Sequence, residues 1–167
     1  MKEATLQKTI LSALSLFAFG LSTSCKSRAD DFTPETIIGM ERTALDRWGK
    51  GDPQGYLEIY AQEVTYFDPM LEKRADGLEA MRKYYAPITG KIKVDRYDMI
   101  DPKVQRHGDV AALSYNLISY GKEPDGKKTV LARWNSTKVY TRIEGQWKIF
   151  HDHWSYIKPD LKQPSGE

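Results

Sequence analysis

The second half of this 167-residue chain contains four long strand-like segments, and they restrict the possible fold more than any other feature. Apolar and polar residues alternate along each segment, as in β-strands with one buried face. Turns rich in Gly, Asp and Glu separate the segments, which should therefore pair as antiparallel neighbours. Pro102 indicates a bulge or a sheet edge, because proline cannot donate a ladder hydrogen bond. The segments span residues 92–105, 110–120, 128–143 and 147–157.

Helical patterns come before these strands. Thr33 and Pro34 supply an N-cap and a first helical position, and an apolar stripe at helical spacing continues to Trp48. A second, shorter helix starts at Asp52-Pro53, with Tyr60 on its apolar face, and residues 64–67 form a short strand. A third helix spans 78–86. Three helices followed by an antiparallel meander predict an α+β fold with the helices on one face of the sheet.

The first 24 residues have the organisation of a secretory signal peptide. A short segment with two lysines precedes an uncharged run over residues 9–21, which is too short to span a bilayer comfortably. Residues 21–25, Leu-Ser-Thr-Ser-Cys, resemble the lipobox of bacterial lipoproteins, where the cysteine is lipidated. Ser22 departs from the large aliphatic residue usual at its position. Cys25 is the only cysteine of the chain, and the alternative is an incidental residue in a cleaved signal.

This resemblance implies a protein exported to the bacterial cell envelope and anchored by lipid, on the periplasmic or outer-membrane face. We expect residues 25–32 to form a polar tether, residues 33–159 to form one domain and residues 160–167 to form a C-terminal tail. The formal net charge of +2 is small and evenly mixed, which argues against a nucleic-acid partner.

Motifs across the predicted domain resemble the nuclear transport factor 2-like superfamily. They are Gly51-Asp52, the Val-Thr-Tyr-Phe-Asp-Pro segment 64–69, Gly77-Leu78-Glu79 and the closing segment 145–155. The closing segment is similar to the association domain of calcium/calmodulin-dependent kinase II and to SnoaL-like bacterial proteins. The resemblance implies a cone-shaped fold, in which a strongly curved, mostly antiparallel sheet wraps around three helices and encloses a pocket. It also implies a homodimer formed through the outer sheet face.

Asp68 is the candidate catalytic residue, because it ends a strand directly before Pro69. In ketosteroid isomerase, a member of this superfamily, the aspartate general base takes the matching place. A carboxylate at the edge of an apolar pocket suits proton abstraction. The alternative is that Asp68 only caps a turn, as Asp before Pro often does. The isomerase also needs a tyrosine on its first helix to stabilise an enolate oxygen, and the matching position here is Ala44.

The kinase association domain lines its pocket with arginines from three strands, and the matching positions here are Leu117, Lys138 and Trp154. One cation is retained and two are lost. The resemblance therefore implies a more aromatic pocket for a flat or apolar ligand with at most one anionic group. The predicted lining comprises Tyr60, Tyr66, Asp68, Tyr84, Tyr85, Tyr115, Leu117, Trp134, Lys138, Asp152 and Trp154.

His151 and His153 are two residues apart and should project from the same face of a strand. Zinc would need a third ligand that the pattern does not supply, so neither a metal nor a cofactor is predicted. Strand parity groups both histidines with Trp147 and Ile149. If Trp154 faces the pocket, all four lie on the outer sheet face or in a dimer interface, unless a bulge interrupts the alternation.

Three functions remain open from the sequence. The first is a non-enzymatic module that binds a small organic ligand. The second is a cofactor-independent isomerase, lyase or hydrolase with Asp68 as its base. The third is an oligomerisation module with a vestigial pocket.

Overall fold

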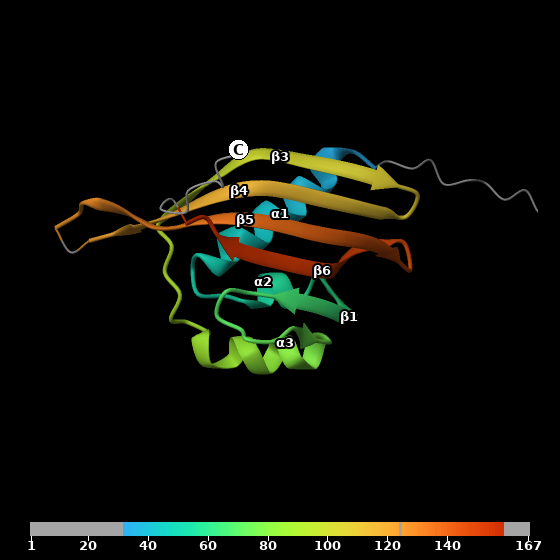
Figure 1. Ribbon diagram of the computed structural model, residues 1–167, viewed down its shortest axis with the longest axis horizontal. Helices are drawn as coiled ribbons and strands as arrows, with labels where there is room; N and C mark the ends of the chain where they lie inside the picture. The colour runs from blue at the N-terminus through green and yellow to red at the C-terminus, as the bar shows by residue number, and fades with distance from the viewer. Residues whose placement is uncertain (1–31, 124, 159–167) are drawn as a thin grey trace, which may run out of the picture. The chain divides into compact units, whose positions relative to one another are not determined.

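The computed structural model describes residues 32–123 and 125–158, in which helices lie on one face of a curved sheet (Figure 1). The predicted signal peptide, Cys25 and the predicted C-terminal tail lie outside the described residues. The helices are α1 (Pro34–Trp48), α2 (Gln54–Leu57) and α3 (Leu78–Tyr85), and the 3-10 turn η1 (Ala86–Ile88) follows α3. The strands are β1 (Tyr60–Phe67), β2 (Ala75–Asp76), β3 (Arg96–His107), β4 (Val110–Lys122), β5 (Lys128–Ile143) and β6 (Gln146–Tyr156).

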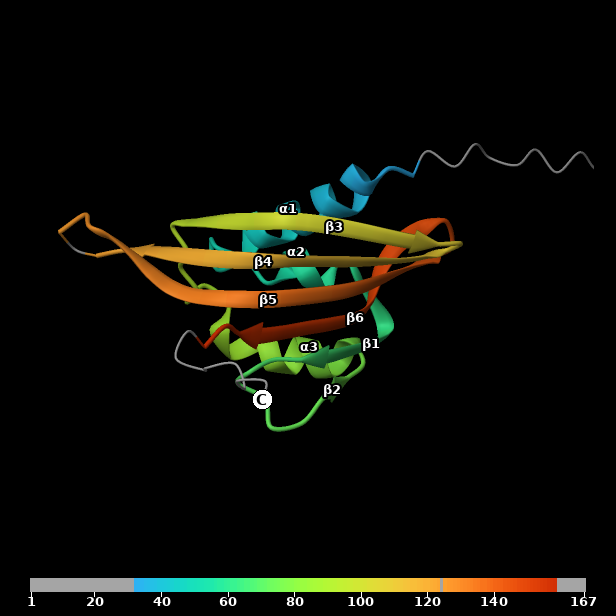
Figure 2. The same cartoon turned by 45° about the horizontal axis from the view of Figure 1, so that its top comes forward.

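The six strands form one sheet in the order β2-β1-β6-β5-β4-β3, which is not closed into a barrel. Strands β3 to β6 form the predicted antiparallel meander, while β1 runs parallel to β6 and antiparallel to β2. All three helices lie behind the same sheet face, and none of the described helices covers the other face (Figure 2). The predicted α+β class with a curved, mostly antiparallel sheet is thus confirmed.

The region between α1 and α3 differs from the prediction. The second helix is a single turn, and Tyr60 begins β1 instead of continuing that helix. Residues at both ends of β1 are buried, including Tyr60, Ala61, Val64 and Tyr66. Pairing with β6 therefore outweighs the helical spacing of the apolar residues, because local propensity is weak compared with tertiary packing. The two-residue strand β2 was not predicted.

Within the described residues, the strand pairing shifts register at four places, and two of these shifts bear on the predictions. The β3–β4 register shifts between Ile100 and Lys103, and Asp101 has φ 47°, so the predicted irregularity at Pro102 is confirmed on what is also an edge strand. In β6 the partners change from Tyr140–Ile149 to Val139–His151, which leaves Phe150 as an extra residue. Such an insertion reverses the side-chain alternation beyond it.

The core lies between α1, α3 and the concave sheet face. Its centre includes fully buried Ile37, Val64, Met81, Leu113 and Ile149. The buried face of α1 carries one charged residue, Glu41, with 0% exposure. A buried carboxylate needs hydrogen-bond partners, and these partners form the floor of the candidate site.

Candidate functional site

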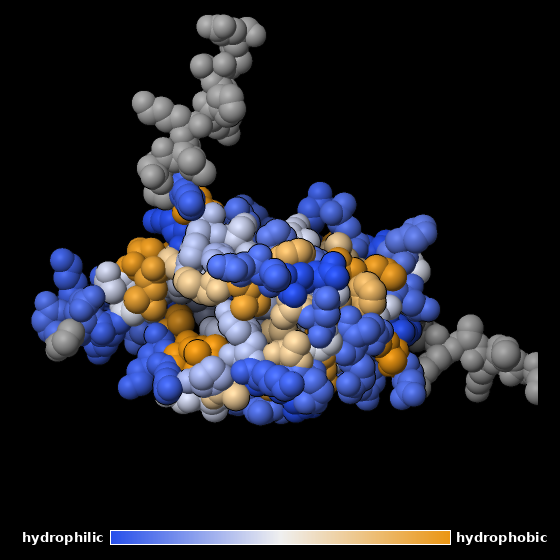
Figure 3. All heavy atoms as spheres, turned by 60° about the horizontal axis from the view of Figure 1, so that its bottom comes forward, coloured by the Kyte–Doolittle hydropathy of each residue, from blue (hydrophilic) through white to orange (hydrophobic). Residues whose placement is uncertain are grey.

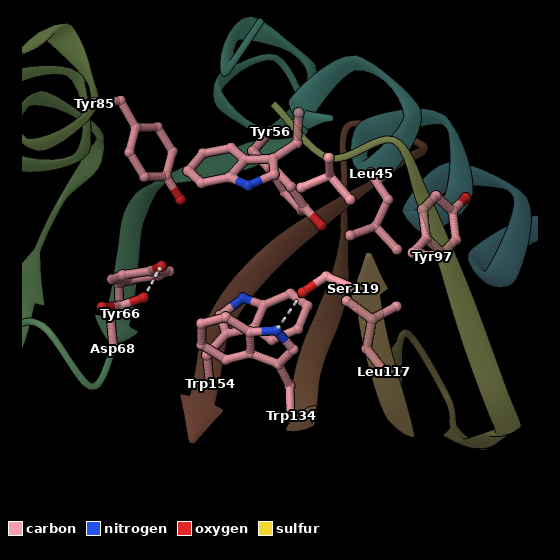
Figure 4. Close-up of a pocket in the computed structure, with 12 residues that line it drawn as sticks. Leu45, Tyr56, Tyr66, Asp68, Tyr85, Tyr97, Leu117, Ser119, Trp134 and Trp154 are labelled. Atoms are coloured by element: carbon pink, nitrogen blue, oxygen red, sulfur yellow. Dashed lines mark hydrogen bonds between the residues drawn. The ribbon is translucent and has the colours of Figure 1, made fainter. Parts of the chain in front are cut away.

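A pocket opens between the helices and the inner face of the sheet (Figure 4). Trp134 of β5 and Trp154 of β6 form one wall, at 5.8 Å between ring centroids and 80° between ring planes. Tyr56 and Leu45 lie across the cavity from them, and Tyr66 and Asp68 lie at its β1 side. The remaining lining residues are Trp48, Tyr85, Val94, Tyr97, Leu117 and Ser119.

The enclosed part of this pocket has a volume of about 100 Å³. A cavity of about 150 Å³ holds one benzene molecule. The pocket as folded is therefore somewhat smaller than a benzene-sized cavity, so a single ring would extend into its open mouth and a four-ring steroid would have to displace wall side chains. Seen from the α3 side, apolar side chains gather beside a hollow on an otherwise largely hydrophilic surface (Figure 3).

Asp68 follows directly after β1 and is held by three hydrogen bonds. The Met70 amide donates to Oδ1 at 2.7 Å and the Tyr84 hydroxyl to the same atom at 3.2 Å, while the Tyr66 hydroxyl donates to Oδ2 at 3.0 Å. The amide contact is the turn cap that Asp-Pro predicts. The carboxylate nevertheless lines the pocket, so capping and a ligand contact are compatible.

Beneath the aromatic wall lies a buried charge cluster formed by Glu41, Lys138 and Asp152, each with 0% exposure. The Lys138 ammonium lies 2.5 Å from Asp152 Oδ1 and 3.6 Å from Glu41 Oε1. Both carboxylates also accept tyrosine hydroxyls. Glu41 accepts from Tyr56, Tyr115 and Tyr140 at 2.5 to 2.9 Å, and Asp152 accepts from Tyr60 at 2.7 Å. Two carboxylates and one ammonium give the cluster a formal charge of −1.

Burial raises the pKa of Tyr56, Tyr60, Tyr115 and Tyr140 well above the usual phenol value, and the neighbouring carboxylates raise it further. These hydroxyls therefore keep their protons at neutral pH and act as donors to the cluster. Burial raises the pKa of Tyr85 in the same way.

Six of the predicted pocket residues line the cavity: Tyr66, Asp68, Tyr85, Leu117, Trp134 and Trp154. Tyr84 lies at its margin through its bond to Asp68. Four others belong to the layer below: Tyr60, Tyr115, Lys138 and Asp152. Lys138, predicted to offer the ligand a cation, thus does not line the cavity. Its strand position does point inward, but Glu41 and Asp152 already surround its ammonium group.

The grouping of Trp147 and Ile149 with the histidines is wrong. Trp147 is 7% exposed and Ile149 is 0% exposed, and both pack in the core. The extra residue Phe150 reverses the alternation, so Asp152 and Trp154 also face inward. His151 and His153 lie on the opposite face, where His151 Nδ1 is 2.8 Å from Thr65 Oγ1 and both rings contact Phe67.

The sequence prediction missed Glu41 and several wall residues. Glu41 lies on the apolar stripe of α1, and a charged residue in that stripe was the signal for a buried polar partner. Trp48 lay on the same stripe. Nothing local marked Val94, Tyr97 or Ser119. Tyr97 and Ser119 belong to β3 and β4, whereas Val94 precedes β3 and donates its backbone N–H to the Gly49 carbonyl.

Comparisons with known proteins place this fold and site in a family. The model of the calcium/calmodulin-dependent protein kinase II association domain matches residues 35–158, so the chain belongs to that family. A protein of Parabacteroides distasonis described as a provisional ketosteroid isomerase is 40% identical, with a TM-score of 0.67, over 80% of this chain and 94% of that one.

More distant structures share the fold. The association domain of C. elegans CaMKII is 23% identical, with a TM-score of 0.62, over 72% of this chain and 93% of that chain. The S. rosetta CaMKII hub is 22% identical, with a TM-score of 0.59, over 74% and 95% of the two chains.

Two further observations concern residues 32–123 and 125–158 alone. No group of three or more His, Cys, Asp or Glu side chains there is arranged to hold a metal ion. No helix in that part of the chain combines the length and apolarity needed to cross a membrane.

Proposed function

We propose that this domain binds a small, flat organic ligand of about one ring in the pocket between the helices and the sheet. The observation that carries the proposal is the wall formed by Trp134 and Trp154, which lies open to the cavity instead of being filled by other side chains. Rigid aromatic walls with few polar groups are typical of small-molecule sites. The ligand would stack against the wall and make polar contacts with Asp68 and Ser119 at opposite sides.

The test is thermal unfolding and tryptophan fluorescence of the full chain with three single-ring probes: benzylamine, benzyl alcohol and benzoate. We expect at least one probe to raise the Tm, because a ligand that binds only the folded state stabilises it. Trp154→Ala should weaken that binding about tenfold, because it removes an aromatic contact. Val130→Ala is the control, since Val130 of the neighbouring strand β5 is 45% exposed and does not line the pocket. If none of the three probes binds, the proposal is wrong.

An enzyme is the second candidate function, and Asp68 is the observation that favours it. Its carboxylate lines an apolar cavity in a fixed orientation, and the 40% identical relative is described as a provisional ketosteroid isomerase. Ala44, fully buried in α1, supplies no oxyanion donor. A candidate base without a donor for the developing enolate favours binding over isomerisation.

The enzyme alternative predicts that Asp68→Asn abolishes turnover of a small enolisable ketone while the fold persists. The introduced amide would keep an oxygen acceptor for the Met70 amide N–H, so the turn should survive. Proton–deuterium exchange at the carbon next to the carbonyl, followed by NMR, is the measurement. Equal exchange rates for the wild type and the variant would exclude Asp68 as a base.

We further propose that the protein is a lipid-anchored cell-envelope protein and a homodimer. Cys25 and the preceding signal pattern support the anchor, and loss of radiolabelled-palmitate incorporation in Cys25→Ser tests it.

Two observations support pairing through the outer sheet face. One is the likeness to the CaMKII hub, and the other is the exposure of Phe67 and Phe150 beside His151 and His153. Light scattering of Phe67→Lys tests the pairing, and an unchanged mass would argue against that face.

A further inference from the structure

The lining of the ligand pocket has an uneven set of charged groups. From this set the proposed function can be made more specific. Asp68 is the only charged residue among the described residues that line the pocket. No lysine or arginine lines it, since Lys138 is enclosed below the wall by two carboxylates. In the part of the chain that the structure describes, the pocket lining therefore has one negative group and no positive group, while Lys158 lines the adjoining hollow on the outer side of Asp68 and Trp154.

The hydroxyl protons of the lining tyrosines are already engaged by other protein groups. Tyr56 donates to Glu41, Tyr66 donates to Asp68, and Tyr97 donates to Asp46 at 2.8 Å. Tyr85 lies 3.1 Å from the hydroxyl of Tyr60. Because Tyr60 gives its single proton to Asp152, Tyr85 must be the donor in this pair.

The Ser119 side of the pocket shows the same pattern. The Ser119 hydroxyl lies 3.4 Å from the Ala132 carbonyl as a donor, and it accepts the Trp134 indole N–H at 3.3 Å. The hydroxyl groups can therefore offer a ligand oxygen lone pairs, while the indole N–H groups of Trp48 and Trp154 have no hydrogen-bond acceptor among the described residues and are further donors in the lining. The preference between charges then rests on Asp68, which attracts a ligand that brings N–H donors with a positive charge and repels an anion.

The buried cluster of Glu41, Lys138 and Asp152 below the wall also affects which ligand charge the pocket favours. The Lys138 ammonium lies 4.2 Å from the centroid of the Trp154 ring, which alone would disfavour a second cation on that ring. Glu41 and Asp152 offset part of this positive charge, because both carboxylates lie beside the same ammonium group. Aromatic faces attract cations through the negative potential above the ring, and most strongly so in a desolvated site.

From these observations we propose that the pocket selects a small organic cation, an amine or ammonium group attached to a flat or apolar body of one ring's size. The cationic nitrogen lies between the aromatic wall and Asp68, where the carboxylate supplies the counter-charge. This proposal rests on the proposed binding function and adds the charge of the ligand. It replaces the anionic group that the sequence implied.

The test compares benzylamine, benzyl alcohol and benzoate by isothermal titration calorimetry on the full chain at neutral pH. The three probes share one ring and carry charges of plus one, zero and minus one. We expect benzylammonium to bind about 10- to 30-fold more tightly than benzyl alcohol, and benzoate to bind more weakly than either. Equal affinities for all three probes would overturn the cation proposal while leaving ligand binding intact. Absence of binding by all three would overturn both.

Two variants locate the effect. Asp68→Asn should weaken benzylammonium about tenfold and leave benzyl alcohol within about twofold, because only the charge is removed. Asp125→Asn is the matched control, since Asp125 is an exposed aspartate in the β4–β5 turn that likewise accepts a backbone N–H two residues on. If Asp125→Asn weakens benzylammonium as much as Asp68→Asn does, the attraction arises from net charge and the site assignment fails.

Discussion

Replacing Lys138 with methionine should destabilise the folded protein by about 3 to 5 kcal/mol. The ammonium group lies between two carboxylates that have no exposure, and methionine fills most of the space without supplying a charge. Glu41 and Asp152 would then be two buried negative groups without a counter-ion. Because small domains have only about 5 to 15 kcal/mol of stability, the loss should be visible even before denaturant is added.

Urea unfolding followed by tryptophan fluorescence measures this effect as a lower midpoint at a similar slope. Lys128→Met is the matched control, because Lys128 is an exposed residue of the same strand and should change stability by no more than about 0.5 kcal/mol. The double variant Lys138→Met/Asp152→Asn should recover about 1 kcal/mol or more, since one unpaired charge is removed and Tyr60 keeps an acceptor. If Lys138→Met is as stable as Lys128→Met, the cluster does not hold the charges assigned to it.

The fold was largely predictable because the signals that specify it are local. Turn residues, alternation and the proline at position 102 each act over a few residues, and they predicted β3 to β6 with boundaries close to those observed. The Thr33-Pro34 start of α1 is another such signal, and α1 begins at Pro34. The region around Tyr60 was mispredicted because its state depends on the distant strand β6, which the local pattern cannot represent.

Residues of the candidate site were predicted correctly only where a local pattern or the family resemblance fixed a single position. Asp68 was found because it follows a recognisable strand pattern, and Trp154 because it matches a pocket position of the kinase association domain. The sequence did not predict that Lys138 is enclosed. Its orientation follows from strand parity, whereas its availability to a ligand depends on Glu41, which lies 97 residues earlier in the sequence. The family resemblance thus predicts where a retained cation lies in the fold, but not which residues surround it. The charge preference that we propose for the pocket depends on those surrounding residues, because they enclose Lys138.

Ile149→Ala should destabilise the protein by about 2 to 5 kcal/mol, the range for an isoleucine removed from a packed core. Ile149 has 0% exposure and pairs with Tyr60 on one side and Tyr140 on the other. A regular β6 would place it on the same face as His153, where truncation would have little effect. The bulge at Phe150 separates the two residues to opposite faces.

His153→Ala is therefore the informative comparison, measured by the same urea titration. His153 is exposed and its ring contacts Phe67, so the substitution should change the stability by no more than about 0.5 kcal/mol. A large loss of stability for Ile149→Ala together with a small one for His153→Ala would show that the two side chains lie on opposite faces of β6. Comparable losses for both residues would mean that β6 is regular, and then Asp152 could not reach Lys138 while Ile149 stays in the core. The inward positions of Asp152 and Trp154, and with them the aromatic wall and its charged floor, depend on that single inserted residue.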